Sequence, residues 1–310
     1  MVALLLALTL LWSAGPAGAA QLDAETATDT ERAGEELSAF DAVILGVVEG
    51  VTEYLPVSST GHLIVTQRIL DVGQDDATRD AMDAYTVVIQ VGAIVAVLIL
   101  YWRRVERMVL GLLGRDPEGL RMVGVVLAAF LPAVVMALTL GDVIKDELLE
   151  VGPVVVAWIL GAFVIFLTAP RFRDAARGRA LESLLARQAL LIGVAQVVAF
   201  WPGVSRSFVT IIGGLLVGLS LPAAVEFSFL LGLATLTAAT GYTLVTDGST
   251  INEAYGLAMP ALGIVAAFIS AALAVKWMVG YLNRHDLTIF GWYRLGIAAV
   301  TIALLATGVV

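Results

Sequence analysis

Two segments of this chain gather the side-chain types needed to bind and transfer a phosphoryl group. In the first segment, EGVTEYLPVSSTGH, the side chains with this chemistry are Glu49, Glu53, Ser58, Ser59, Thr60 and His62. In the second segment, PGVSRSFVT, they are Ser205, Arg206, Ser207 and Thr210. Phosphoryl transfer depends mainly on positioning and charge neutralisation, often with a divalent cation between carboxylates and phosphate oxygens. The two segments together could supply that chemistry.

The charged residues of the two segments have complementary uses. Glu49 and Glu53 are four residues apart, so on a helix they share one face and could hold a divalent cation such as Mg²⁺ or Ca²⁺, or exchange protons. Arg206 is a permanent cation whose fork of N–H donors matches phosphate oxygens, and the sequence offers it no evident structural partner. The remaining hydroxyls are candidate substrate-binding groups, namely Ser58, Thr60, Ser205, Ser207 and Thr210.

Each of these residues also has a structural interpretation. Serines and threonines at a helix break often only cap the next helix. His62 could hydrogen-bond to backbone groups in the core. Gln90, inside an apolar stretch, could simply hydrogen-bond to a neighbouring helix. The two glutamates are harder to explain in this way, because carboxylates inside an apolar run are costly and usually face a functional cavity.

Composition indicates that the elements positioning these residues lie in a membrane. Of the 310 residues, 59% are hydrophobic and 15% are charged, and the mean hydropathy is +0.93. A net charge of −9 argues against a nucleic-acid partner, which would require a basic face. The chain has no cysteine and two histidines, so cysteine chemistry is excluded and zinc has few ligands.

Hydropathy predicts an all-α polytopic membrane protein with six spanning helices, since about 20 apolar residues cross a bilayer. The predicted spans are 84–102, 120–141, 151–170, 224–245, 256–280 and 289–310. Two further apolar segments, 41–70 and 187–221, are interrupted by Pro56 and by Pro202-Gly203. Each of these two segments is therefore predicted to be a helix, a break and a second helix.

The charges of the connections predict the orientation. Connections 103–121 and 171–187 contain five arginines each, so both are placed in the cytoplasm. Connection 142–150 has four acidic residues and one lysine, and connection 246–255 has two acidic residues and no basic one, so both are placed outside. This arrangement requires each broken segment to return to the side from which it entered. The two are therefore predicted to be re-entrant hairpins, one from each side.

The two hairpins also resemble each other in sequence. A shift of 147 residues places Gly46 on Gly193 and Ser58 on Ser205, with the breaks at matching points. Repeats that enter from opposite faces form inverted-topology proteins, in which broken helices meet near the midplane and build the site. Backbone freed at such breaks is tolerated where it lines a polar cavity.

The N-terminal region, residues 1–40, is predicted to lie outside the membrane domain of residues 41–310. A short apolar run followed by Ala17-Gly18-Ala19 resembles a secretory signal with its cleavage site, although no basic residue precedes the run. Residues 21–40 carry six acidic residues and one arginine without apolar periodicity, which predicts a solvated linker.

The long motifs EGVTEYLPVSSTGHLIV, YTVVIQVGAIVAVLILY and PGVSRSFVTIIGGLLVGLSLPAAVEFSFLL closely resemble the undecaprenyl-diphosphate phosphatase family of the BacA type, over residues 41–310. The resemblance implies six spanning helices with two re-entrant helix pairs, an outward-facing site in the inner membrane, and a role in bacitracin resistance. It implies that the active-site residues are Glu49, Glu53, Ser59, His62 and Arg206. Members commonly have Gly and Ala after SRS, where this chain has Phe208 and Val209, so backbone near the phosphate could be repositioned.

On this resemblance we expect hydrolysis of a polyprenyl diphosphate to the monophosphate and phosphate, which recycles a lipid carrier for cell-wall synthesis. Ser59 is the favoured nucleophile, while activation by His62, attack on His62 and direct attack by water stay open. A transporter or flippase of a phosphorylated lipid is the alternative, since inverted repeats are also a transporter design. A non-catalytic scaffold would leave the buried charges unexplained. The sequence leaves the isoprenoid length, the metal and any homo-oligomer undecided.

Overall fold

The computed structural model describes residues 37–172 and 178–310. Within these ranges the regular secondary structure consists of helices, and the sole extended pairing is an isolated bridge between Arg179 and Leu219. The predicted signal segment and all but the last few residues of the predicted acidic linker lie outside the described residues.

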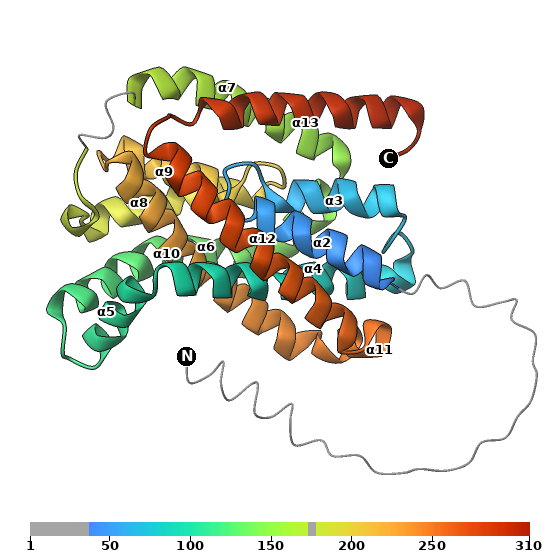
Figure 1. Ribbon diagram of the computed structural model, residues 1–310, viewed down its shortest axis with the longest axis horizontal. Helices are drawn as coiled ribbons and strands as arrows, with labels where there is room; N and C mark the ends of the chain where they lie inside the picture. Colours follow the sequence, from blue (N-terminus) through green and yellow to red (C-terminus); the bar gives the residue numbers. More distant parts are fainter. Residues whose placement is uncertain (1–36, 173–177) are drawn as a thin grey trace, which may run out of the picture. The chain divides into compact units, whose positions relative to one another are not determined.

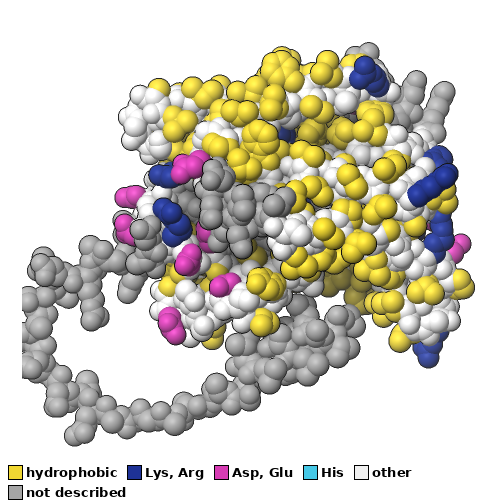
Figure 2. Space-filling view, turned by 180° about the vertical axis from the view of Figure 1, so that it is seen from behind, with side chains coloured by type: hydrophobic (Ala, Val, Ile, Leu, Met, Phe, Trp, Pro, Cys, Tyr) yellow, Lys and Arg dark blue, Asp and Glu magenta, His cyan; other side chains and the backbone are white. Residues whose placement is uncertain are grey.

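Among the described residues, six helices are long and apolar enough to cross a membrane, which confirms the predicted all-α polytopic class. They are α4 (Asp76–Leu100), α6 (Pro117–Leu148), α7 (Val151–Thr168), α10 (Leu221–Thr246), α12 (Ala258–Leu282) and α13 (Thr288–Thr307). The predicted second span, 120–141, agrees with the apolar stretch Pro117–Thr139, although α6 itself continues to Leu148 and leaves only a short connection to α7. One face of the protein is largely hydrophobic, with charged side chains gathered toward its two ends (Figure 2).

Both predicted breaks are present. The first hairpin consists of α2 (Ala39–Thr52) and α3 (Ser59–Leu70), separated by a turn that contains Pro56. The second consists of α8 (Ala186–Val197), a short 3-10 segment η4 (Val198–Phe200) and α9 (Arg206–Leu216). Proline removes a backbone donor and clashes with the preceding turn, so each helix ends before it.

The hairpins approach each other from opposite ends of the helix bundle (Figure 1). The α8–α9 pair lies toward the end that carries α5 (Trp102–Leu112), and the α2–α3 pair lies toward the end that carries α11 (Gly248–Tyr255). The predicted connections 103–121 and 246–255 therefore each contain a helix. The connection after α4 folds as a helix because Val105 and Met108 pack against the hydrophobic core.

Small residues let each hairpin approach a spanning helix closely. A Cβ atom on Gly46 of α2 would lie 2.9 Å from the Cα of Gly263 on α12, and one on Gly193 of α8 would lie 2.9 Å from the Cα of Ala129 on α6. Small residues at such crossings allow the backbone contact that drives helix association in membranes. The 147-residue shift aligns these two glycines with each other. The two copies of the repeat therefore use the same position for close packing against a spanning helix.

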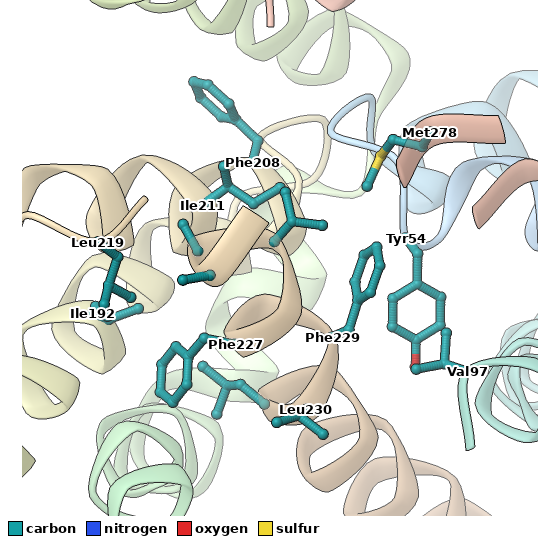
Figure 3. Close-up of a cluster of buried hydrophobic side chains, with 14 of the residues drawn as sticks. Tyr54, Val97, Ile192, Phe208, Ile211, Leu219, Phe227, Phe229, Leu230 and Met278 are labelled. Carbon is teal, nitrogen blue, oxygen red and sulfur yellow. The ribbon is translucent and has the colours of Figure 1, made fainter. Parts of the chain in front are cut away.

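The main core lies between the second hairpin, α10 and the turn of the first hairpin (Figure 3). Tyr54, within that turn, meets the ring of Phe229 on α10 edge-on, with the ring centroids 5.2 Å apart. Such edge-to-face contacts contribute about 0.5–1.5 kcal/mol beyond the burial of the rings. The turn that carries the first set of candidate residues is thereby anchored to α10.

Candidate active site

The two hairpin turns have the same local structure. Ser58 is the N-cap of α3 with φ 76°, and Ser205 is the N-cap of α9 with φ 78°. Their hydroxyls accept from the backbone N–H groups of Gly61 and Phe208, respectively. A positive φ at a residue with a side chain costs on the order of 1–3 kcal/mol and is concentrated at functional sites. Each of the two copies of the sequence repeat therefore contains the same strained turn.

The turns also bond to each other. Gly203 of the second turn donates its N–H to the hydroxyl of Ser58 at 3.2 Å. In the opposite direction, the hydroxyl of Ser207 donates to the carbonyl of Leu55 at 2.7 Å. The free N-terminal ends of α3 and α9 are therefore held close together. Such ends favour anions, because their N–H groups and helix dipoles point outward.

Carbonyl groups freed by the breaks are satisfied by two residues that sequence analysis missed. Trp158 on α7 donates its indole N–H to Val57 at 2.9 Å. Arg294 on α13 donates to Pro56 at 2.8 Å, and also to two carbonyls of the second turn, those of Gly203 and Val204. Within a bilayer such groups need partners from the protein. The one signal available for Arg294 was a lone cation inside a spanning segment.

Three of the predicted residues meet in one hydrogen-bonded group. Arg206 donates from Nη2 to Oε1 of Glu53 at 2.6 Å and from Nη1 to the hydroxyl of Thr235 at 2.7 Å. Ser59 donates its hydroxyl to Oε2 of Glu53. Arg206 also lies over the ring of Tyr54, with its Cζ 5.7 Å from the centroid. The expectation that Arg206 has no structural partner is therefore wrong, because Glu53 and Thr235 both bind it.

This group borders a cavity of about 140 Å³ between the hairpins. Six of its lining residues were predicted from the sequence, namely Glu53, Ser58, Ser59, Thr60, Ser205 and Arg206. The other four are Gln90, Ala199, Pro202 and Leu236. The cavity thus combines charged and hydroxyl groups with a smaller apolar part, which suits a polar head group attached to an apolar chain. The buried carbonyl oxygen of Gln90 accepts no hydrogen bond from the described residues.

Besides Glu49, three predicted residues do not line this cavity. His62 bonds through Nδ1 to the carbonyl of Ser58 at 2.6 Å and through Nε2 to the hydroxyl of Tyr293 at 2.9 Å, so neither ring nitrogen reaches Ser59. The hydroxyl of Thr210 pairs with Ser228 on α10 at 2.7 Å. Ser207 is the third, because its hydroxyl is taken up by the first turn.

Phe208, one of the two residues expected to reposition backbone near the phosphate, also lies outside the cavity lining. Its side chain is buried, and its ring centroid lies 4.7 Å from Cζ of Arg294. This side chain is therefore accommodated beneath the turns and does not occupy the space between them.

The carboxylate oxygens of Glu49 and Glu53 are suitable ligands for a divalent cation. Glu49 is fully buried beside Glu53, and its two carboxylate oxygens accept no hydrogen bond from the residues that the structure describes. The described ranges contain no cluster of three or more acidic or histidine residues able to hold a metal by themselves. Mg²⁺ is commonly held by one or two carboxylates together with substrate phosphates and water. Glu53 at the cavity, with the buried Glu49 next to it, matches that arrangement.

The fold and the site together define a class of polytopic membrane protein, in which two broken hairpins from opposite ends of the bundle enclose a polar cavity. The chain belongs to the family described as bacitracin resistance protein BacA, whose model matches residues 42–300. The family resemblance stated from the motifs is thereby confirmed.

Several relatives align over nearly their full length. The chain is 46% identical to undecaprenyl-diphosphatase 2 of Rhodospirillum rubrum over 269 residues, which cover 87% of this chain and 96% of that protein. It is 42% identical to the undecaprenyl-diphosphatase of Sorangium cellulosum, over 86% of each chain. It is also 42% identical to the undecaprenyl-diphosphatase of Acidovorax ebreus, over 89% of this chain and 98% of that protein.

Proposed function

We propose that this chain hydrolyses undecaprenyl diphosphate to undecaprenyl monophosphate and inorganic phosphate. Family membership and the names of the aligned relatives support this activity. The observation that carries the proposal is the hydrogen-bonded group of Ser59, Glu53 and Arg206 beside the cavity. It combines a hydroxyl nucleophile, a proton acceptor and a phosphate-binding cation, as phosphoryl transfer requires.

The proposed reaction begins with attack by Oγ of Ser59 on the terminal phosphorus, while Glu53 accepts the hydroxyl proton. The bond from that phosphorus to the bridging oxygen breaks, and undecaprenyl monophosphate leaves. The departing monophosphate takes the proton from Glu53. Water then attacks the phosphoserine and gives a proton to Glu53, the bond from phosphorus to Oγ breaks, Oγ of Ser59 takes that proton back, and phosphate is released. Arg206 and the N-terminal ends of α3 and α9 neutralise the charge that develops on the phosphate oxygens.

The other predicted residues are proposed to bind the substrate or to position the reacting groups. The hydroxyls of Ser58, Thr60 and Ser205 border the cavity and are proposed to contact the diphosphate. We assign His62 a positioning role, since its two nitrogens join the start of α3 to Tyr293 on α13. Activation of Ser59 by Glu53 is preferred over activation by His62 for the same reason.

A divalent cation is proposed to be held by Glu49 and Glu53. When bound, it would neutralise diphosphate charge and polarise the phosphoryl oxygens. The unsatisfied oxygens of Glu49 support this assignment, because a buried carboxylate without a partner is costly.

We further propose that the protein resides in the cell membrane with the site facing outward. The arginine-rich connections support this orientation through the positive-inside rule. Recycling of the lipid carrier and resistance to bacitracin would follow from the activity, the latter in agreement with the family description. Assembly into a homo-oligomer stays a prediction.

The direct test uses the purified chain in detergent and in liposomes, with undecaprenyl diphosphate labelled on its terminal phosphate. Hydrolysis predicts release of labelled phosphate that depends on a divalent cation and stops on chelation. A transporter or flippase predicts instead that intact lipid diphosphate moves between the leaflets. Movement without phosphate release would contradict the proposal.

A further inference from the structure

We propose that Arg294 is a positioning residue that sets the spacing between the two hairpin turns, and with it the spacing between Ser59 and Arg206. This inference rests on the proposed function, because it assigns Arg294 to the hydrolysis reaction without direct contact with the substrate. It is based on the contacts of one side chain that lies in α13, outside both hairpins.

A single guanidinium group spans the two halves of the site. Nε donates to the carbonyl of Pro56 at 2.8 Å in the first turn. In the second turn, Nη1 donates to Gly203 at 3.2 Å and Nη2 donates to Val204 at 2.6 Å. All three nitrogens are thus used, and the residue is completely buried. A fixed fork of donors holds the three carbonyls in a defined arrangement.

Each of these carbonyls is close in the chain to a residue of the cavity. Pro56 precedes Ser58 by two residues, and Val204 precedes Arg206 by two. The Gly203 peptide is held at both ends, since its N–H donates to Ser58 while its carbonyl accepts from Arg294. A displacement of Arg294 would therefore move both turns relative to each other.

The surroundings of Arg294 accommodate its position behind the turns. Gly161 on α7 leaves space for the guanidinium, since a Cβ there would lie 3.0 Å from Cζ of Arg294. The ring of Phe208 packs against the charge on another side. No ion pair of Arg294 occurs in the part of the chain that the structure describes. A buried cation inside a membrane is costly. The three hydrogen bonds to backbone carbonyls account for the presence of Arg294 at this position.

Lysine cannot replace this arrangement. Its ammonium is a single donor centre and cannot reach carbonyls on two turns at the three positions occupied by Nε, Nη1 and Nη2. In Arg294→Lys the turns would lose at least one link and shift. Because a misplacement of about 1 Å can lower turnover by about 100-fold, the expected effect is on the chemical step.

The first experiment compares Arg294→Lys and Arg294→Gln with the wild type, using purified monodisperse protein. We expect kcat to fall by about 100-fold while KM stays within about threefold. Gly291→Ala, three residues before Arg294, is the matched control, since a Cβ there would lie 2.8 Å from Phe166 and disturb α7–α13 packing with the guanidinium retained. It should lower the Tm with kcat unchanged per folded molecule. A kcat of Arg294→Lys within about threefold of wild type would overturn the inference.

A second experiment is independent of activity. The chain lacks cysteine, so single cysteines at exposed Ile69 on α3 and Leu216 on α9 allow two spin labels to report the distance between the hairpins. We expect a shifted or broader distance distribution in Arg294→Gln and an unchanged one in Gly291→Ala. An unchanged distribution in Arg294→Gln would also overturn the inference. If the wild type releases no phosphate, the proposed function fails, and the distance measurement still decides whether Arg294 holds the turns.

Discussion

Arg206 and Glu53 stand 153 residues apart in the chain and form an ion pair of 2.6 Å at the meeting point of the two hairpins. The other oxygen of Glu53 accepts from Ser59. One carboxylate thus joins the cation suited to phosphate with the hydroxyl suited to attack. The side chains of the pair are 16% and 7% exposed, so loss of either partner leaves a largely buried charge uncompensated.

Replacement of Glu53 by glutamine should nearly abolish turnover, because the amide cannot accept the proton of Ser59. We expect kcat to fall by about 100- to 10,000-fold, the usual contribution of general acid–base catalysis. The measurement is phosphate release per folded molecule. Glu226→Gln is the control, since Glu226 pairs with Arg104 and lies outside the cavity lining, and it should keep near-normal kcat. Comparable rates for Glu53→Gln and the control would contradict the role.

Arg206→Lys should lose most activity although the charge is kept. An ammonium cannot bind Glu53 and Thr235 at the two positions used by the guanidinium and also contact phosphate oxygens. Loss of one preorganised contact to the transition state lowers turnover by about 100- to 1000-fold.

Steady-state kinetics on the purified variant test this expectation, with Arg284→Lys in the connection before α13 as the control. If Arg206 served only to pair the hairpins through Glu53, the lysine variant would retain a rate within about threefold of wild type. That outcome would remove Arg206 from the phosphate-binding role.

Glu49→Gln should weaken the binding of a divalent cation to the resting enzyme. The two oxygens of Glu49 have no hydrogen-bond partner among the described residues and are therefore free to act as ligands. Titration with Mn²⁺ followed by electron paramagnetic resonance measures the affinity without substrate. We expect a loss of at least about tenfold. Equal affinity in wild type, Glu49→Gln and Glu53→Gln would show that the glutamates do not hold the ion.

Reporter fusions test the orientation. Fusions after Arg115 and Arg179 should remain in the cytoplasm, because these residues lie within the arginine-rich connections, and fusions after Glu147 and Thr250 should be exported. The opposite pattern would place the cavity-bearing hairpins in the reverse orientation and would contradict an outward-facing site.

The hairpins and their relationship were predictable because their signals are local. Proline and glycine interrupt apolar runs, and the 147-residue shift aligns the two N-capping serines, Ser58 and Ser205. The same shift aligns Gly46 with Gly193, and the structure places each of these glycines at a helix crossing. The charges of the connections then required the two hairpins to enter the membrane from opposite sides. This agrees with the arrangement of the two hairpins within the described bundle.

The supporting contacts were not predictable, because they depend on which helices become neighbours. Nothing near Arg294 in the sequence indicates that it bonds to turns 238 and 91 residues away. The orientation of the His62 ring was likewise not predictable from the sequence. It follows Ser59 by three residues, but its ring turns toward Trp158 and Tyr293. Proximity in a motif therefore did not amount to contact in the fold.

Ser59 provides the most direct test of the whole account. Undecaprenyl diphosphate labelled on the terminal phosphate is mixed with wild-type enzyme and with Ser59→Ala, and released phosphate is counted per folded molecule over single turnovers. The account predicts rapid release by the wild type, a rate lower by about 1000-fold or more in Ser59→Ala, and label on Ser59 in rapidly quenched wild-type protein. Equal release by both enzymes, with no label on the protein, would contradict it.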